Sequence, residues 1–568
     1  MKGILPGVVA LALLVDGGVS AWAQPVAPGS AGASVIPAGS SETVSRGEGG
    51  TVVRAIRLQE PLRVDGTLDE AIYEEIPPIS DFIQQEPQEG QPATERTEAW
   101  IFFDAENVYI SARCWDSHPE RAIANEMRRD SGNIIQNENF AVTFDTLNDG
   151  RNGVLFQLSK LGGLLDVAIT DERDRNPDWN AVWDARTADF DQGWTAEVVI
   201  PFKSLRYAAG QEQTWGVQMR RIVRWKNEWS YLTAVPAFMG PRAMLAVSLG
   251  ATLEGLEAPP ASKNLEIKPY MIFGTRSDWT VTPTVKNDLE GDLGFDLKYG
   301  VTKSLTADVT YNTDFAQVEN DEQQVNLTRF NLFFPEKRDF FLEGQGIFAF
   351  GGAGNTTGRG GPVSAPVMFF SRRIGLNEGL PVPITGGGRL TGKAGKYAIG
   401  VVNIQSGEDE TAGARSTNFS VLRLKRDLFQ RSNVGAIYTR RSVLTVGDGV
   451  GETFGVDALA SFSTSLNINM YYARTRAPGR SGRDASYMAR FDYDTDRYGL
   501  QLDHTVVEEN FNPEVGFLRR SNFDRRYVTA RFSPRPAAGN MTAIRKFFYV
   551  ASYDHFVHGS GRLDTRDV

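Results

Sequence analysis

The stretch DLGFDLKYGVTKSLTADVTYN, residues 292–312, alternates between polar and apolar residues along almost its whole length. Its first half carries apolar side chains at every second position: Leu293, Phe295, Leu297, Tyr299 and Val301. After the turn Val301-Thr302-Lys303-Ser304, the second half repeats the pattern with Leu305, Ala307, Val309 and Tyr311. Alternation with a period of two residues is typical of a β-strand. The stretch therefore predicts a hairpin with one apolar face.

What the apolar face of this hairpin contacts decides the fold. In a soluble sandwich such a face packs on a second sheet, whereas in an outer-membrane barrel it meets lipid while the polar face lines the lumen. Beyond the N-terminal region the sequence has no run of roughly 20 apolar residues, which is the length that a membrane-spanning helix needs. If the mature chain enters a membrane, it must therefore do so as strands.

The N-terminal residues predict export from the cytoplasm. Lys2 supplies a positive start, Ile4–Val15 is an apolar run, and Ala21-Trp22-Ala23 fits a small-residue cleavage site. We therefore predict a signal peptide over residues 1–23. An uncleaved anchor is the alternative, although the apolar run is short for a bilayer span. Residues 24–50 are rich in Gly, Ser, Ala and Pro, which predicts a flexible linker.

The composition narrows the class of protein. The chain has 57 glycines, 11% aromatic residues and a mean hydropathy of −0.30, which suits a β-rich protein with many turns. A net charge of −10 argues against nucleic acid as a partner. Cys114 is the only cysteine, so an intrachain disulfide is excluded.

Residues 51–255 contain short strand-forming runs separated by acidic, glycine-containing or asparagine-containing turns. These runs are Ala99–Phe103, Val108–Trp115, Phe140–Asp145, Val154–Leu158, Trp194–Ile200 and Trp215–Arg221. Their regular spacing predicts a β-sandwich. Pro259-Pro260 marks the boundary that follows it.

Residues 264–568 return to the alternating pattern of the opening stretch. The runs are Tyr397–Ile404, Thr417–Leu424, Val434–Thr439, Leu466–Tyr472, Tyr498–Val506 and Tyr527–Phe532. At roughly 20 to 25 residues per strand and connection, the segment predicts about 12 to 14 strands. The predicted fold is thus all-β, with an N-terminal β-sandwich and a C-terminal antiparallel transmembrane β-barrel. The chain ends without a terminal aromatic residue, so either this barrel does not use that signal or it is incomplete at its C-terminus.

The first predicted domain resembles family 9 carbohydrate-binding modules. The resemblance rests on an ordered set of motifs: Val64-Asp65-Gly66-Thr67-Leu68-Asp69-Glu70 with Tyr73, Phe103-Asp104-Ala105-Glu106-Asn107-Val108-Tyr109, Gly193-Trp194-Thr195-Ala196-Glu197, Ile200-Pro201-Phe202 with Leu205, Trp215-Gly216 and Arg220-Arg221. It implies a β-sandwich that binds a saccharide.

The second predicted domain resembles an uncharacterised outer-membrane barrel family, DUF5916. The motifs are Asp314-Phe315-Ala316-Gln317-Val318-Glu319, Leu332-Phe333-Phe334-Pro335-Glu336-Lys337-Arg338, Phe340-Phe341-Leu342-Glu343-Gly344, Gly388-Arg389-Leu390-Thr391-Gly392 and Asn510-Phe511-Asn512-Pro513-Glu514-Val515-Gly516-Phe517. Because the role of that family is poorly defined, the resemblance implies an architecture more than an activity.

Aromatic and polar residues that suit a sugar cluster in one part of the predicted sandwich. Sugar rings stack on aromatic side chains, and their hydroxyls bond to amides, carboxylates and guanidinium groups. The predicted ligand-binding residues are Asp174, Arg175, Trp179, Asn180, Trp183 and, as part of a weaker pair with Trp229, Trp225. The alternative is that Trp179 and Trp183 are core residues, and the sequence favours neither interpretation.

A possible cation site lies further towards the N-terminus. Asp145 and Asp149, with Asn148 and Asn152, place oxygen ligands around two glycines. Carboxylates and amides suit calcium, and family 9 modules can carry structural calcium. The spacing differs from that of an EF-hand, and Asn-Asp-Gly is a common hairpin turn, so we favour a turn without metal. No other cofactor is expected.

Carboxylates that could serve a glycosidase occur in the second domain. Glu336, Asp339 and Glu343 lie among several phenylalanines, which could raise a carboxyl pKa. Lys337 and Arg338 lie beside them as ion partners, so we favour an inward-folded segment that packs the barrel lumen. No common catalytic motif is present, and we assign no catalytic residue.

These patterns predict an outer-membrane protein of a Gram-negative-type bacterium. Its sandwich would bind a saccharide or glycan, and its barrel would contact lipid, with a role in glycan recognition or uptake. One alternative is a glycoside hydrolase of carbohydrate catabolism. The other is a structural envelope protein without a sugar ligand.

Overall fold

The computed structural model describes most of the chain from Glu42 to Val568. The described residues are 42–47, 50–172, 174–177, 179–208, 210–259, 265–279, 284–302, 304–313, 333–334, 336, 338–342, 344–352, 365–377, 380–410, 412–429, 431–536, 544 and 546–568. The predicted signal peptide lies outside them. Within the described part, no helix is both long and apolar enough to span a membrane.

The N-terminal part is built from two β-sheets. The larger sheet has the order β1 (Val44–Gly47), β2 (Gly50–Arg54), β15 (Ala251–Glu257), β13 (Glu212–Val223), β7 (Asn139–Asp145), β8 (Gly153–Ser159), β9 (Leu164–Thr170) and β10 (Asp174–Asn176), and β14 (Glu228–Tyr231) and β4 (Ile83–Glu86) branch from β13. The smaller sheet has the order β11 (Asp184–Phe190), β12 (Gly193–Pro201), β6 (Asn107–Trp115), β5 (Thr97–Phe103) and β3 (Ile56–Arg57). Every strand predicted for this part is present.

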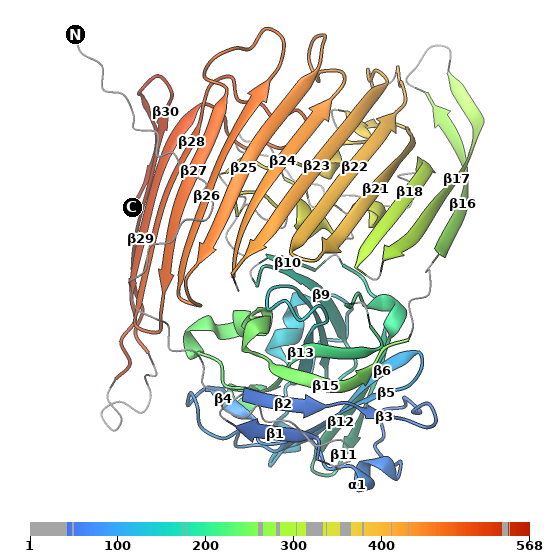
Figure 1. The fold of residues 1–568 in the computed structure, drawn as a ribbon, viewed down its shortest axis with the longest axis vertical. Helices are drawn as coiled ribbons and strands as arrows, with labels where there is room; N and C mark the ends of the chain where they lie inside the picture. The colour runs from blue at the N-terminus through green and yellow to red at the C-terminus, as the bar shows by residue number, and fades with distance from the viewer. Residues whose placement is uncertain are drawn as a thin grey trace, which may run out of the picture.

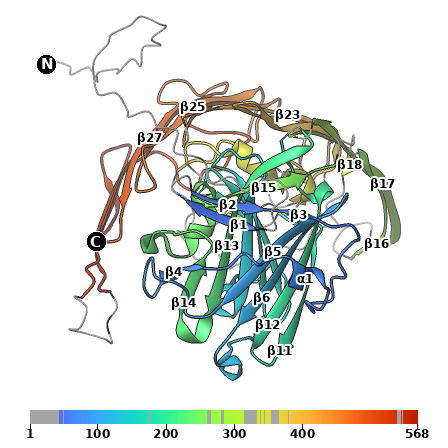
Figure 2. The same cartoon turned by 60° about the horizontal axis from the view of Figure 1, so that its bottom comes forward.

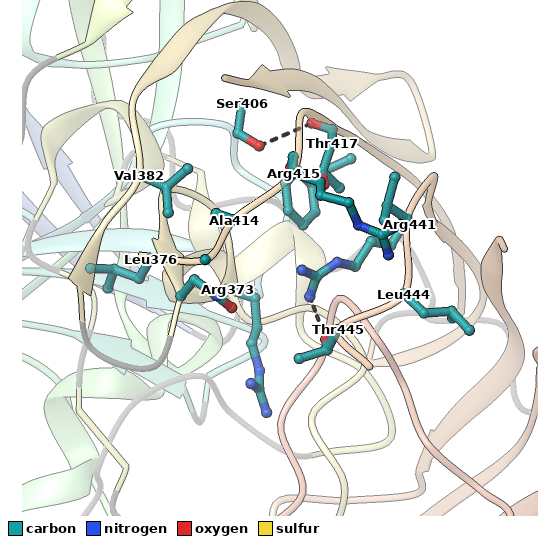
Figure 3. Close-up of a pocket in the computed structure, with 15 residues that line it drawn as sticks. Arg373, Leu376, Val382, Ser406, Ala414, Arg415, Thr417, Arg441, Leu444 and Thr445 are labelled. Atoms are coloured by element: carbon teal, nitrogen blue, oxygen red, sulfur yellow. Dashed lines mark hydrogen bonds between the residues drawn. The ribbon is translucent and has the colours of Figure 1, made fainter. Parts of the chain in front are cut away.

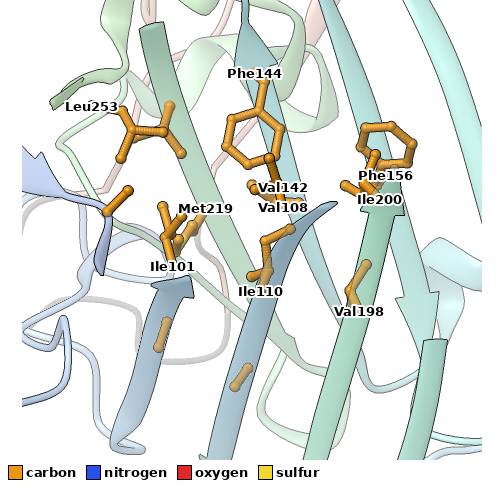
Figure 4. Packing of buried hydrophobic residues seen from close by; sticks show 14 of the residues in the cluster. Ile101, Val108, Ile110, Val142, Phe144, Phe156, Val198, Ile200, Met219 and Leu253 are labelled. Atoms are coloured by element: carbon orange, nitrogen blue, oxygen red, sulfur yellow. The ribbon is translucent and has the colours of Figure 1, made fainter. Parts of the chain in front are cut away.

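Alternate side chains of the two sheets face each other and form one apolar core (Figure 4). Ile101 and Ile110 of the smaller sheet lie opposite Met219 and Val142 of the larger sheet. All four side chains are buried. Burial of such apolar surface is the main force that holds the two sheets together.

The folded sandwich begins at an earlier residue than the predicted start at residue 51. β1 pairs with β2 from Val44 to Gly47, inside the segment predicted as a flexible linker up to residue 50. Val44 packs against the sandwich core, and this contact fixes a segment whose composition indicated flexibility. The linker prediction was therefore wrong at its C-terminal end.

In the described residues, most of the C-terminal part forms an antiparallel sheet of 14 strands, which curves over the sandwich (Figures 1 and 2). In order, the strands are β16 (Leu265–Asp278), β17 (Val285–Thr302), β18 (Leu305–Thr313), β21 (Ile384–Ala394), β22 (Tyr397–Ser406), β23 (Thr417–Leu428), β24 (Ser432–Arg441), β25 (Gly451–Ser461), β26 (Leu466–Arg476), β27 (Ala485–Asp494), β28 (Tyr498–Val507), β29 (Phe523–Phe532), β30 (Tyr549–His558) and β31 (Leu563–Asp567). The number agrees with the upper end of the prediction. Among the described strands, β16 and β31 form the two edges of the sheet.

The outer face of this sheet is largely apolar and exposed, whereas its inner face is covered and carries both polar and apolar side chains. In the hairpin of β17 and β18, Leu293 is 66% exposed and Tyr311 56% exposed. Thr306, Asp308 and Thr310 alternate with the apolar residues of β18 and are buried. The same alternation recurs at outward positions of later strands, with exposed Leu424, Val456, Met470, Tyr472, Leu502 and Val528. This is the pattern of a barrel wall rather than of a sandwich face.

An inner segment fills the space behind the middle of the sheet. It includes α2 (Asp339–Leu342), η7 (Gln345–Phe348) and η8 (Ser371–Arg373), followed by the small hairpin of β19 (Leu376–Asn377) and β20 (Leu380–Pro381). Its apolar side chains pack on inward residues of the wall in one buried cluster that includes Phe341, Phe348, Phe350, Met368, Phe369, Val402, Ile404, Phe419, Val421, Ile437 and Met488. The predicted inward-folded segment is confirmed.

The two ends of the sheet differ in the length of their connections. At the end near the sandwich, the turns after β17, β21, β23, β25 and β27 contain two to four residues, and only the connection after β29 is long. At the opposite end, the loops after β22, β24, β26 and β28 contain eight to fifteen residues. The sandwich therefore lies against the short-turn end (Figure 1).

Candidate functional site

The segment between β10 and β11 forms a surface around one buried carboxylate, that of Asp166. Asp166 accepts hydrogen bonds from the backbone N–H of Ala181 at 2.6 Å and from the Trp183 indole at 3.2 Å. It also accepts from the Arg129 guanidinium at 2.6 Å, and Arg129 donates to the Asn180 amide oxygen at 2.7 Å. The buried Asp166 carboxylate thus fixes the position of the predicted ligand-binding segment through Ala181, Trp183 and Arg129.

The two tryptophans of this segment have different environments. Trp183 is only 7% exposed, and its ring packs edge-on against Phe156 at 5.1 Å between centroids. Trp179 is half-buried and meets the same phenylalanine at 5.9 Å. Asn180 is exposed, and Val182 beside it is exposed as well. Trp183 is therefore a core residue, whereas Trp179 retains accessible surface next to an exposed amide.

The other predicted sugar-binding residues lie elsewhere. Asp174 and Arg175 belong to β10, which pairs with β9, and the next residue, Asn176, donates to the backbone oxygen of Leu342 in the inner segment at 3.3 Å. This strand therefore lies against the interior of the curved sheet. Arg175 is exposed, as a ligand-binding residue would need to be.

Trp225 follows the end of β13 in a separate polar cluster. Its indole N–H lies 3.2 Å from the Asp116 carboxylate, and Arg121 lies over its ring at 4.4 Å. The ring also contacts Lys226 and His118. The described contacts of Trp225 do not include the Trp179 segment, so the structure does not join these two predictions into one site.

The predicted cation loop forms a turn whose oxygens are already occupied. Asp145 accepts from the backbone N–H groups of Asp149 and Gly150, at 3.2 and 2.6 Å. Asp149 in turn accepts from the Lys393 ammonium at 2.6 Å. Burial and the nearby Asp149 charge raise the pKa of Asp145 to about 7, which disfavours the ionised form that a cation requires. The described residues contain no group of three or more His, Cys, Asp or Glu side chains that could hold a metal ion. These contacts support the turn interpretation.

A network of charges instead joins this part of the sandwich to the turns of the sheet. Arg151 lies 3.0 Å from Asp171 of the sandwich and 2.9 Å from Asp427 of the sheet. Lys425 lies 2.5 Å from Asp171, and Lys393 lies 2.8 Å from Asp427 as well as bonding to Asp149. Burial favours the neutral form of Asp171, but the charges of Lys425 and Arg151 outweigh this effect and hold its pKa at about 2. The network is an ionised junction between the two parts of the chain.

Sequence analysis did not identify this junction. Its members come from two sandwich turns and two hairpins of the sheet, and Asp149 and Lys393 are 244 positions apart. The sequence does show several charges at residues 171–175, of which Asp174 and Arg175 were interpreted as sugar-binding residues. A surface turn rich in charges looks the same in sequence whether it binds a ligand or another part of the chain.

The carboxylates considered for catalysis are only partly described. Both oxygens of Glu336 bond to the Arg338 guanidinium, at 2.7 and 2.6 Å, and the Ser371 hydroxyl donates to one of them. Glu336 and Arg338 are buried. Glu343 and Lys337, and the side chain of Asp339, lie outside the described residues. Glu336 is thus engaged in a buried ion pair, which is a structural arrangement.

A cavity of about 540 Å³ lies where the sandwich meets the inner face of β25 to β30. The sandwich contributes Phe238, Met239 and Arg242 to its wall, and the sheet contributes hydroxyl and amide side chains such as Ser461, Asn467, Gln501 and Thr529. Four arginines and four carboxylates line it, so the charges of the wall balance. A cavity of this size and polarity suits a neutral, hydroxyl-rich molecule.

Comparisons with known proteins agree with the family resemblance of the second half. Residues 261–380 match the family model described as a domain of unknown function, DUF5916. No curated protein matches the chain.

Solved structures give similarities in both halves, all at low identity. A family 9 carbohydrate-binding module from Caldicellulosiruptor kristjanssonii in complex with cellotriose is 13% identical, covers 37% of this chain and 95% of its own, and has a TM-score of 0.25. Pseudomonas aeruginosa OpdQ is 10% identical over 76% of this chain and 92% of its own, with a TM-score of 0.24. P. aeruginosa OccK2 in complex with glucuronate is 9% identical over 75% of this chain and 92% of its own, also with a TM-score of 0.24. The fold assignment rests on the strand pairings described above.

Proposed function

We propose that this chain is an outer-membrane protein whose curved sheet lies in lipid and whose sandwich binds a saccharide. The observation that carries the membrane location is the apolar outer face of the 14-stranded sheet. An apolar face of this extent is not left in water by a soluble protein. Alternation of apolar outward and polar inward residues is the signature of strands that span an outer membrane.

The lengths of the connections support one orientation in the membrane. Outer-membrane barrels have short turns on the periplasmic side and longer loops outside. The sandwich is docked at the short-turn end, so we place it in the periplasm. Phe429 is 94% exposed in one of these turns, and Phe462 is exposed in another, which suits the aromatic residues found at a lipid–water boundary.

The Trp179 segment is the surface that we propose for the saccharide. Trp179 offers an indole face held in place by Phe156, and Asn180 offers an amide held by Arg129. An aromatic face beside a fixed amide matches the two surfaces of a sugar ring. The sequence resemblance to family 9 carbohydrate-binding modules supports the same class of ligand.

We infer that the curved sheet anchors the sandwich rather than serving as an open pore or an enzyme. The buried cluster around Phe348 and Phe369 fills the interior behind the middle strands. Of the three carboxylates considered for a glycosidase, Glu336 is engaged in a buried ion pair with Arg338.

Fractionation tests the membrane part of the proposal. Expressed with its leader in a Gram-negative host, the chain should sediment with the outer membrane and need detergent for extraction. External protease should cleave the long loops while leaving the sandwich intact. Recovery in the soluble periplasmic fraction would contradict the proposal.

Tryptophan fluorescence of the full chain in detergent tests the ligand. A panel of glucose, cellobiose and xylobiose should include at least one sugar that changes the emission, and W179A should weaken that response at least tenfold. Trp279 is an exposed tryptophan directly after β16 of the curved sheet, so W279A is the matched control and should retain the affinity. Equal loss in both variants, or no response to any sugar, would count against saccharide binding at Trp179.

A further inference from the structure

A small pocket lies at the loop end of the curved sheet, opposite the sandwich. Its volume is about 50 Å³, and its wall comes from η8, from β19 and from the loops that follow β22 and β24. Three arginines line it, Arg373, Arg415 and Arg441, together with the hydroxyl-bearing Ser406, Thr417 and Thr445 (Figure 3). Three cationic groups around so small a space need an explanation.

The hydrogen bonds of these arginines leave part of their donor capacity unused. Arg441 donates to the Thr445 hydroxyl at 2.5 Å, but its Nε is buried and has no partner within the described residues. Arg373 donates from Nε to the Gly516 backbone oxygen at 3.1 Å. Arg415 bonds to Asp448 and to the Gly447 backbone oxygen, both at 2.6 Å. Within the described residues, Arg441 thus keeps one buried N–H donor that has no partner.

No carboxylate of the described residues forms a direct ion pair with the two inner arginines, Arg373 and Arg441. In the described part of the chain, no carboxylate oxygen lies within 4.0 Å of a guanidinium nitrogen of Arg373 or Arg441. The nearby Glu514 accepts instead from the Thr445 backbone, the Thr445 hydroxyl and the Asn512 amide, at 3.0, 2.8 and 2.7 Å. Asp448 pairs with the exposed Arg415.

Other inward arginines of the same sheet are paired. Arg389 lies 2.8 Å from Asp308, and Arg423 lies 2.6 Å from Asp457. Withdrawing a guanidinium from water is costly unless an anion compensates the charge. Among the described residues, the carboxylate that acts electrostatically on both Arg373 and Arg441 is that of Glu514, and it forms a direct ion pair with neither.

We propose that this pocket binds one oxyanion group, a phosphate or a carboxylate, that reaches it from the loop side of the sheet. Guanidinium groups hold both kinds of oxyanion through paired N–H donors. Arg441 and Arg373 supply the charge, Thr445 positions Arg441, and Arg415 closes the outer side. Because Thr445 and Arg415 are exposed, a ligand has access from the loops. This site lies apart from the Trp179 surface and does not depend on the saccharide proposal.

Thermal unfolding of the full chain in detergent tests the site. Sodium phosphate and glucuronate are the anionic probes, sodium chloride at matched ionic strength is the blank, and glucose is the neutral probe. At least one anionic probe should raise the melting temperature of the wild type and of W179A, and titration calorimetry should show one site. Stabilisation by phosphate alone assigns a phosphate ligand, and stabilisation by glucuronate alone assigns a carboxylate ligand.

Substitutions locate the effect. R441Q should weaken binding of that probe at least tenfold, whereas R440Q, the neighbouring arginine on the other face of β24, should change it less than twofold. T445V provides a second variant at an exposed position and should weaken binding several-fold. The proposal is overturned if neither anion binds the wild type at millimolar concentration, or if R441Q and T445V both bind like R440Q.

Discussion

Replacing Asp171 by Asn should loosen the sandwich from the curved sheet. In the wild type its carboxylate bonds to Lys425 and Arg151, and its side chain is 14% exposed. The fall of its pKa from 3.8 to about 2 corresponds to about 2.5 kcal/mol, at about 1.4 kcal/mol for each pH unit. The substitution also leaves Lys425 buried without its carboxylate, and breaking such a pair typically costs about 3 to 5 kcal/mol. We therefore expect D171N to weaken docking by about 3 kcal/mol.

Hydrogen exchange measures this change at the junction itself. A loss of about 3 kcal/mol should speed exchange of the β9 and β10 backbone amides about a hundredfold, provided that they exchange through undocking. D184N is the matched control, because Asp184 forms an exposed pair with Arg186, and exposed pairs contribute little. D171N combined with K425M should recover part of the loss, since neither charge is then left unpaired.

Acid should have the same effect as the substitution. The pKa of Asp171 is lower in the folded protein than in the unfolded chain, so its contribution is complete above about pH 4 and disappears as the pH falls towards 2. The reasoning is refuted if D171N and D184N exchange at the same rate, or if the wild-type junction shows no acid dependence that D171N lacks.

Three further predictions concern the core, the lipid face and a buried acid. W183A should lower the free energy of unfolding by about 3 to 5 kcal/mol, measured by denaturant titration, because Trp183 fills the core against Phe156. L502R on the outer face of the sheet should make folding into the membrane less favourable by about 2 to 4 kcal/mol and reduce insertion. L161R in a sandwich turn is the control and should have little effect, although Leu502 and Leu161 are similarly exposed, at 41% and 39%. Insertion assays into lipid vesicles distinguish the two variants. Burial raises the pKa of Glu138 to about 7, above its unfolded value of 4.5. The free energy of unfolding of the wild type should therefore fall by about 3 kcal/mol as the pH rises from 4.5 to 7. E138Q should remove the decrease in melting temperature between pH 4.5 and 7 that Glu138 causes. An unchanged pH profile in E138Q would contradict this prediction.

Local sequence pattern predicted the strands well because strand periodicity is a local property. The alternation from Leu293 to Tyr311 identified both the hairpin and the face that would be exposed. Pairing between consecutive strands then follows from short connections, which are also visible in the sequence. The inner segment was predictable for a similar reason, since Glu336 and Arg338, two positions apart, form an ion pair.

Contacts between distant segments were beyond the reach of the same reasoning. Whether Trp183 packs in the core or faces a ligand depends on Phe156 and Asp166, which lie on other strands. The pairing of Asp171 with Lys425 joins residues 254 positions apart. The arginine pocket requires Arg373 and Arg441 from separate elements. In each case the residue type was visible, but its partner was set by tertiary packing.

The attachment of the sandwich at several separate turns has a mechanical consequence. Contacts of Lys393, Lys425, Arg431 and Asp494 with the sandwich are spread across the sheet from β21 to β27. A body held at several spaced points cannot swivel as a body on a single tether can. The orientation of Trp179 relative to the curved sheet is therefore fixed. With the sheet in a bilayer, as we propose, the protein would meet a glycan polymer by lateral diffusion of the whole molecule.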